Sequence, residues 1–221
     1  SGSMARADAA ITKTFRQLVT GFEGERIGLV IFDGTAVSVF PLTDDYQFTL
    51  EQLAQAQAVF EGDANPMTFY EGVNNSVGTS LIGDGLASCV QSFDQLDANR
   101  ARSIILATDN QVVGKPLFSL REAGEYAKAK SVRVYAVNPA DTGADQESAE
   151  LRRVVEGTAG AYYPLADPAA TAGIIGQVQS QEATLIKSAA RRFRSDDPRG
   201  LIAMSGIALL GLLAAGRRWR R

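Results

Sequence analysis

The chain has 221 residues, of which 45% are hydrophobic and 21% are charged, enough for one globular domain with an appendage. It has one cysteine, Cys89, and no histidine, which excludes disulfides, Cys/His zinc sites and Ser–His or Cys–His catalysis within this sequence. The net charge is −10 over residues 1–186 and +7 from Lys187 onward, so the body is acidic and the tail is basic. An acidic body argues against nucleic-acid binding, whereas a basic tail favours a membrane.

The first part of the body shows helical spacing, then a hairpin pattern, then a second helix. Residues 26–32 form a short apolar run typical of a buried strand, and Asp33-Gly34 is a turn signal. Thr49 and Gln52 have the spacing of a capping box at the start of a helix. In order, we expect a helix at 4–20, strands at 26–32 and 36–40, and a helix at 50–60.

The second part alternates helices and strands. Apolar residues at helical steps, from Ile82 to Leu96, predict an amphipathic helix that starts near Leu81. In order, we then expect a strand at 103–108, a helix at 119–130, a strand at 132–137, a helix at 146–156, a strand at 161–165 and a helix at 168–182. This alternation predicts an α/β domain over residues 1–182 with a doubly wound, mostly parallel sheet. In such sheets, ligands bind at the carboxyl ends of the strands.

The tail has the pattern of a membrane anchor. We predict a basic linker at 183–199, a transmembrane helix at 200–217 and a basic tail at 218–221. Residues 200–216 carry no charge, and at about 1.5 Å per residue they cover roughly 26 Å, near the short limit for a bilayer core. Flanking arginines and Trp219 extend this length at the interface. A buried core helix, the alternative, seldom ends in four arginines and a tryptophan.

The orientation of the anchor follows from the arginines on its two sides. Four arginines precede the span and four follow it, but Asp196 and Asp197 dilute the charge of the upstream side. The denser tail favours a cytoplasmic C-terminus and an extracytoplasmic domain in the cell membrane.

Three polar loops are predicted at one edge of the sheet. They are Ser1-Gly2-Ser3 before the first helix, Gly78-Thr79-Ser80 before the helix near Leu81, and Thr108-Asp109-Asn110 after the strand at 103–108. Hydroxyl and carboxylate oxygens without histidine or cysteine suit a hard cation such as Mg²⁺. Each hydroxyl before a helix also has a simpler interpretation as a helix cap.

These stretches resemble the von Willebrand factor type A (VWA) family, from residue 1 to about 180. The metal-ion-dependent adhesion site of that family uses a D-x-S-x-S loop, a later threonine and an aspartate in a T-D-G-like turn. "GTSLIGDGLASCV" and "IILATDN" are similar to the family's second and third motifs. The resemblance implies that Ser1, Ser3, Thr79 and Asp109 hold Mg²⁺ or Mn²⁺, the two serines directly and the other two directly or through water.

The sequence departs from the family pattern at its start. The family has a strand and the D-x-S aspartate ahead of the position of Ser1, and neither is present. We therefore expect "SGSM" to be half of the metal loop and the chain to be a fragment, in which the first strand, expected between 26–32 and 103–108, is missing. The alternative is a cloning scar. Asn110 replaces a glycine, a mild change because asparagine tolerates the left-handed region.

The resemblance implies a non-enzymatic binding module. A partner protein would complete the shell of the cation with a carboxylate. With its C-terminal span, the chain is similar to bacterial membrane proteins of the aerotolerance (Bat) type. That likeness implies an alternative role as an adaptor for a MoxR-type AAA+ ATPase, which requires a cytoplasmic domain. Protease protection in intact cells distinguishes the two.

A remote alternative is a phosphatase of the haloacid-dehalogenase type. "IFDGT" at 31–35 is similar to the D-x-D-G-T loop of that family. The nucleophile position falls on Ile31, which cannot attack phosphate. We therefore interpret Asp33-Gly34 as a hairpin turn.

Overall fold

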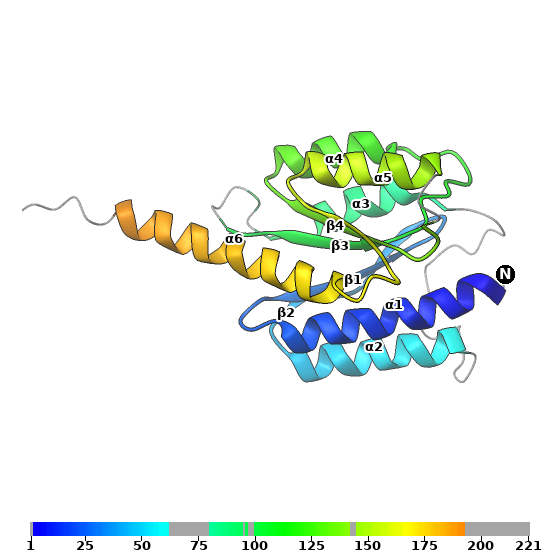
Figure 1. Ribbon diagram of the computed structural model, residues 1–221, viewed down its shortest axis with the longest axis horizontal. Coiled ribbons are helices and arrows are strands. Elements are labelled where there is room, and N and C mark those ends of the chain that lie inside the picture. The colour runs from blue at the N-terminus through cyan, green and yellow to red at the C-terminus, as the bar shows by residue number, and fades with distance from the viewer. Residues whose placement is uncertain (1, 62–79, 95, 97–99, 142–144, 193–221) are drawn as a thin grey trace, which may run out of the picture. The chain divides into compact units, whose positions relative to one another are not determined.

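A computed structural model describes residues 2–61, 80–94, 96, 100–141 and 145–192 (Figure 1). The chain divides into two compact units, Ser1–Glu182 and Ala183–Arg221. The elements in chain order are α1 (Gly2–Gly21), β1 (Ile27–Phe32), β2 (Ala36–Thr43), α2 (Tyr46–Glu61), α3 (Ile82–Gln91), β3 (Ser103–Ala107), α4 (Leu120–Ala129), β4 (Arg133–Asn138), α5 (Gln146–Gly157), β5 (Tyr162–Pro164) and α6 (Ala170–Arg192).

The described strands form two separate sheets. β1 and β2 form an antiparallel hairpin, and β3, β4 and β5 form a parallel sheet in that order. The predicted mixed α/β class with a parallel sheet is confirmed, as is the hairpin turn at Asp33-Gly34. Among the described strands, β1 and β3 are not paired with each other. This break lies where the family resemblance places a further strand.

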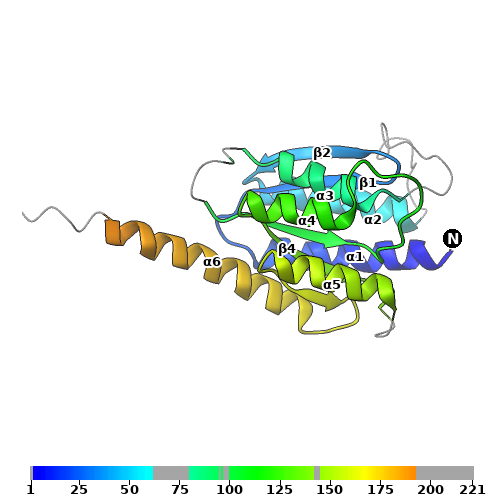
Figure 2. The ribbon, with the colours of Figure 1, turned by 90° about the horizontal axis from the view of Figure 1, so that it is seen from above.

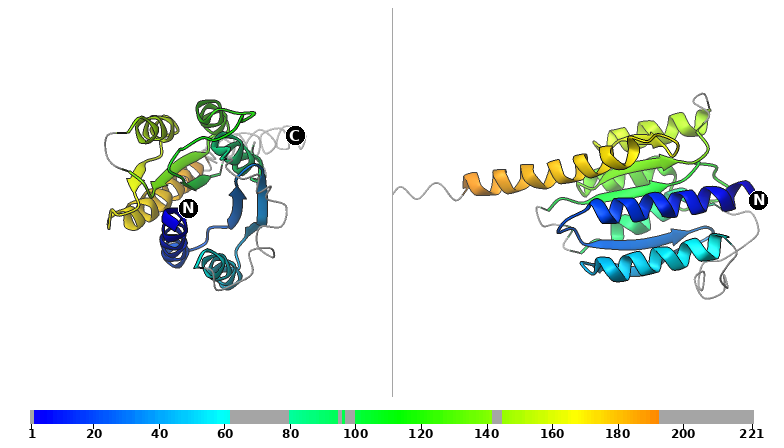
Figure 3. Two further views of the ribbon diagram at one scale, coloured as in Figure 1. Left: turned by 90° about the vertical axis from the view of Figure 1, so that its right-hand side faces the viewer. Right: turned by 60° about the horizontal axis from the view of Figure 1, so that its bottom comes forward.

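Helices cover both faces of the parallel sheet (Figure 3). Alternate residues of a strand point to opposite faces, so Val134 and Ala136 of β4 pack under α3, α4 and α5. Tyr135 and Val137 point the other way, against Leu18 of α1 and residues 170–182 of α6. All four of these β4 side chains are fully buried. The layers are therefore those of a doubly wound domain.

Helix α3 joins the hairpin to the parallel sheet. Its residues contact β1, β2 and β3. Leu81, the residue just before α3, donates its N–H to the carbonyl of Asp33 in the hairpin turn at 2.9 Å. A Cβ at Gly85 would lie 2.5 Å from the ring of Phe32, so the absence of a side chain lets β1 approach the helix. Phe32 in turn packs against the larger core cluster.

Two predicted helix ends are wrong. α2 begins at Tyr46, because the Asp45 carboxylate accepts from the Phe48 N–H at 2.9 Å, so Thr49 lies within the first turn and is not a cap. α3 ends at Gln91 and not near residue 97. A capping box that was not predicted opens α4, where Ser119 and Glu122 exchange hydrogen bonds, which also lower the pKa of the Glu122 carboxyl.

The last described helix is longer than predicted. α6 continues to Arg192, which lies within the segment 183–199 that the sequence analysis assigns to a linker. In the part of the chain that the structure describes, no helix has the length and apolar character that a membrane crossing needs. The predicted span at 200–217 and the tail at 218–221 lie outside the described residues.

Candidate functional site

The loop after β3 carries the one predicted site residue whose side chain is described, Asp109. Thr108 continues the sheet by one bond, since its N–H donates to the Val137 carbonyl at 3.2 Å. Its hydroxyl then accepts from the Asn110 N–H at 3.0 Å, which closes a tight turn around Asp109. Thr108 and Asn110 are both buried, at 8% and 3% exposure. The turn therefore presents Asp109 from a rigid base.

Asn110 adopts a left-handed backbone conformation, with φ of 60°, which asparagine was predicted to tolerate at this position. Its side-chain amide donates to the carbonyl of Glu147 at 2.9 Å, which ties the loop to the first turn of α5. Its buried Oδ1 accepts no hydrogen bond in the described part of the chain. A buried acceptor without a partner is costly, so a hydrogen-bond donor such as a water molecule at Oδ1 would stabilise this loop.

The Asp109 carboxylate is half-buried and has one oxygen to spare. Oδ1 accepts from the Gln111 N–H at 3.0 Å, whereas Oδ2 has no hydrogen bond with any described residue. A carboxylate that is oriented through one oxygen and open at the other is a suitable ligand for a hard divalent cation. The described part of the site therefore fits the expected ion.

The other predicted ligands are less well placed by the structure. Ser3 lies in the first turn of α1. Figure 2 shows that the start of α1 lies at the same end of the domain as the carboxyl ends of the parallel strands. Ser1 and Thr79 lie outside the described residues. Among the described residues, no group of three or more carboxylate, histidine or cysteine side chains is arranged to hold a metal. The assignment of four oxygen ligands stays a prediction.

Asp84 supports the loop that follows Asp109. Its two oxygens accept from the backbone N–H groups of Leu117 and Phe118 at 3.0 and 2.7 Å. These bonds fasten the loop between β3 and α4 to the first turn of α3. The partners are more than thirty residues away from Asp84, so no local pattern signals them.

The same contact requires Gly83. A Cβ at this position would overlap the carbonyl oxygen of Phe118 and lie 2.7 Å from the carbonyl carbon of Ser119, both of which are backbone atoms. We expect Gly83→Ala to destabilise the domain by about 2–3 kcal/mol, which lowers the unfolding temperature by roughly 5–10 °C. Thermal unfolding followed by circular dichroism measures this shift.

Gly176→Ala is the matched control for this change. Gly176 also lies within a helix, but nothing lies within 4 Å of a Cβ built there. Alanine at that position should leave the unfolding temperature unchanged or raise it slightly. Equal behaviour of the two variants would contradict the close approach of α3 to the loop.

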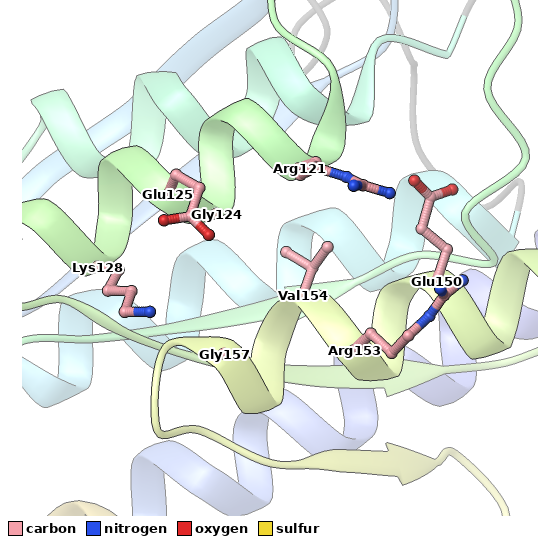
Figure 4. Close-up of a pocket in the computed structure, with 8 residues that line it drawn as sticks. All are labelled: Arg121, Gly124, Glu125, Lys128, Glu150, Arg153, Val154 and Gly157. Atoms are coloured by element: carbon pink, nitrogen blue, oxygen red, sulfur yellow. The ribbon is translucent and has the colours of Figure 1, made fainter.

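A separate groove lies between α4 and α5 (Figure 4). It has a volume of about 240 Å³, and its charged lining residues are of both signs. None of these charged side chains is buried, so water screens them. The groove defines no ligand chemistry. Its lining residues are Arg121, Gly124, Glu125, Lys128, Glu150, Arg153, Val154 and Gly157.

The fold and the Asp109 turn together define a class of protein: an α/β domain with a parallel sheet and a carboxylate at the carboxyl edge of that sheet. Residues 1–180 match the family model of the von Willebrand factor type A domain. The chain belongs to this family, as the sequence motifs predicted. No curated protein matches it.

Two solved structures from Bacteroides share the fold. One is described as an aerotolerance-related membrane protein from Bacteroides fragilis with multiple mutations to serines, at 17% identity and a TM-score of 0.56, covering 77% of this chain and 87% of that one. The other is a conserved hypothetical protein, BatB, from Bacteroides thetaiotaomicron, at 18% identity and a TM-score of 0.55, covering 79% and 87%. At these identities the likeness concerns the fold.

Proposed function

We propose that this chain is a membrane-anchored, non-catalytic VWA-type binding module. Its carboxyl-edge site holds Mg²⁺ or Mn²⁺ through Ser1, Ser3, Thr79 and Asp109. A cation bound there offers a coordination position to a carboxylate of a protein partner. The chain's own residues position the ion and orient the partner, and no bond is made or broken.

The observation that carries this proposal is the free oxygen of Asp109 on a turn fixed by its neighbours. Asp109 is the one formally charged group among the four proposed ligands, so it sets much of the affinity for a dication. The buried Asn110 amide anchors the turn to α5 and holds the carboxylate in place without competing for it. Membership of the VWA family supports the same assignment.

Calorimetric titration of the full chain with MgCl₂ or MnCl₂ tests the proposed site. We expect one saturable event with millimolar or tighter affinity. A chain that gives only the heat of dilution with both ions, while its circular dichroism spectrum is that of a folded domain, would contradict the proposal.

The anchor is tested by deletion. Removing all residues after Arg199 should release the domain from the carbonate-washed membrane pellet into the supernatant, because residues 200–216 contain no charge and supply the apolar length that a span requires. Immunoblotting of the two fractions measures the shift. A truncated chain that stays in the pellet would show that another segment holds it there.

A further inference from the structure

Exposed apolar side chains gather in the loop that joins β3 to α4. Val112 is 47% exposed, Val113 48%, Leu117 89% and Phe118 40%; we call these four residues the apolar loop. Among the described residues, Phe48 is the one other large hydrophobic side chain with comparable exposure. Single exposed apolar residues are ordinary, but a cluster in one short loop marks an interaction surface.

The apolar loop is held in place by its backbone. Val113 and Ser80 exchange two backbone hydrogen bonds of 2.8 and 3.2 Å. The N–H groups of Leu117 and Phe118 donate to the Asp84 carboxylate. A loop that is already fixed loses little conformational entropy when it binds a partner, so its exposed side chains are suited to recognition.

The apolar loop begins at the proposed cation site. Gln111, whose N–H donates to Asp109 Oδ1, is followed directly by Val112. Three residues of extended chain span at most about 11 Å, so the Cα atom of Val112 lies within that distance of the Cα atom of Asp109. A short peptide segment that reaches the cation therefore also reaches Val112, the first residue of the apolar loop.

We propose that the apolar loop selects the partner by the residues beside its carboxylate. The preferred ligand is a protein segment in which an aspartate or glutamate meets the cation at Asp109 while bulky apolar side chains within about three residues of it cover Val112 and Leu117. This proposal rests on the proposed function. Lys115, exposed within the same loop, favours a second acidic residue in that segment. An anionic lipid surface fits less well, because residues 1–186 carry a net charge of −10.

A displayed peptide library with a fixed central aspartate and randomised flanks tests the proposal. The library is selected on the full chain in Mg²⁺ and released with EDTA. We expect leucine, phenylalanine, methionine and valine to be enriched in the flanks by at least about tenfold over the input, which corresponds to burial of one apolar side chain. The double variant Val112→Ser/Leu117→Ser should lose this enrichment and keep the release by EDTA. Leu117→Met, which keeps an apolar side chain, should retain the enrichment.

The outcomes separate the two proposals. EDTA-released peptides with the same flanks from the parent and the double serine variant would overturn the apolar loop and leave the cation site standing. Apolar flanks that depend on Leu117 but resist EDTA would overturn the cation site. If the peptides selected on the parent and on every variant have the same flanking residues as the unselected library, the apolar loop is not a selective surface.

A fluorophore in the loop distinguishes a peptide from a lipid surface. Leu117→Cys can be labelled selectively, because burial raises the pKa of the Cys89 thiol to about 12. With an environment-sensitive label, we expect a blue shift on addition of a selected peptide and Mg²⁺. A blue shift on addition of phosphatidylcholine–phosphatidylglycerol vesicles, with none from the peptide, would overturn the proposal in favour of lipid.

Discussion

Asp109→Ala is expected to reduce Mg²⁺ binding by the full chain below calorimetric detection. Asp109 is the one charged donor proposed for the ion, and a hard dication in a site of hydroxyl oxygens depends on that charge. The loss should be larger than that from any one of the hydroxyl ligands. Titration with Mn²⁺ monitored by electron paramagnetic resonance measures the same loss of cation binding, because the signal of free Mn²⁺ is observed directly.

Two further variants make this result interpretable. Asp109→Asn keeps an oxygen that can accept from the Gln111 N–H, which the parent Oδ1 accepts at 3.0 Å, so the turn should fold while the charge is lost. Asp94→Asn removes an exposed negative charge that pairs with Arg26 at 2.7 Å. Binding should fail in the first variant and persist in the second. Equal affinity in Asp109→Ala and the parent would exclude Asp109 as a ligand.

A strand supplied at the N-terminal side is expected to stabilise the domain strongly. β1 is paired with β2, and β3 with β4, but each has a second edge that no described strand occupies. A strand that pairs with both edges would satisfy two rows of backbone groups, and each buried group left unpaired costs about 1–3 kcal/mol. Allowing for the entropy of ordering the added strand, we expect the unfolding temperature to rise by roughly 10 °C.

The extension should consist of about ten residues with strand-forming side chains, followed by Asp-x directly before Ser1. It should also tighten Mg²⁺ binding, because it adds a second carboxylate to the proposed site. The control is the same extension with proline at alternate positions, which removes the N–H donors that pairing needs. Equal melting temperatures and Mg²⁺ affinities in the chain, the extension and the proline control would contradict both the open edges and the proposed metal loop.

The sequence predicted the elements of the parallel sheet well because their signals are local. The apolar runs at β3 and β4 are short and bounded by polar residues. The end of α3 was not predictable in this way. Phe93 keeps the helical spacing and packs against the core, yet the helix ends at Gln91. The helical spacing of apolar residues predicted which side chains are buried, but it did not predict where the helix ends.

The reason for that early end lies in contacts that are distant or non-periodic. The Ser92 hydroxyl and backbone N–H both donate to the Ser88 carbonyl, at 2.9 and 3.0 Å, and Ser92 is the last residue of the helical turn. Two residues later, Asp94 meets Arg26, which is 68 residues away in the sequence. A pattern read along one segment contains neither the partner nor the direction in which the chain must turn to meet it.

The candidate site divides in the same way. Asp109 was predictable because it follows a buried strand at the carboxyl edge of a parallel sheet, and Asn110 was predicted to tolerate its left-handed backbone. The bond of Asn110 to Glu147 and the support of the apolar loop by Asp84 were not, since both join segments more than thirty residues apart. The exposure of Leu117 follows from that support and could not be derived from an apolar residue in a loop.

The pairing of α1 with α6 sets the order in which the domain can be completed on the ribosome. Gln179 of α6 donates to the carbonyl of Gly21 at the end of α1, across 158 residues of sequence. At about 5–20 residues per second, α1 waits roughly 10–30 s for that partner during synthesis. The pairings of β3 with β4 and of β4 with β5 join segments closer in the chain and can form earlier. Until α6 emerges, the cluster of Leu18 with Tyr135 and Val137 lacks Ile174 and Val178, so the core on this face of the sheet is incomplete.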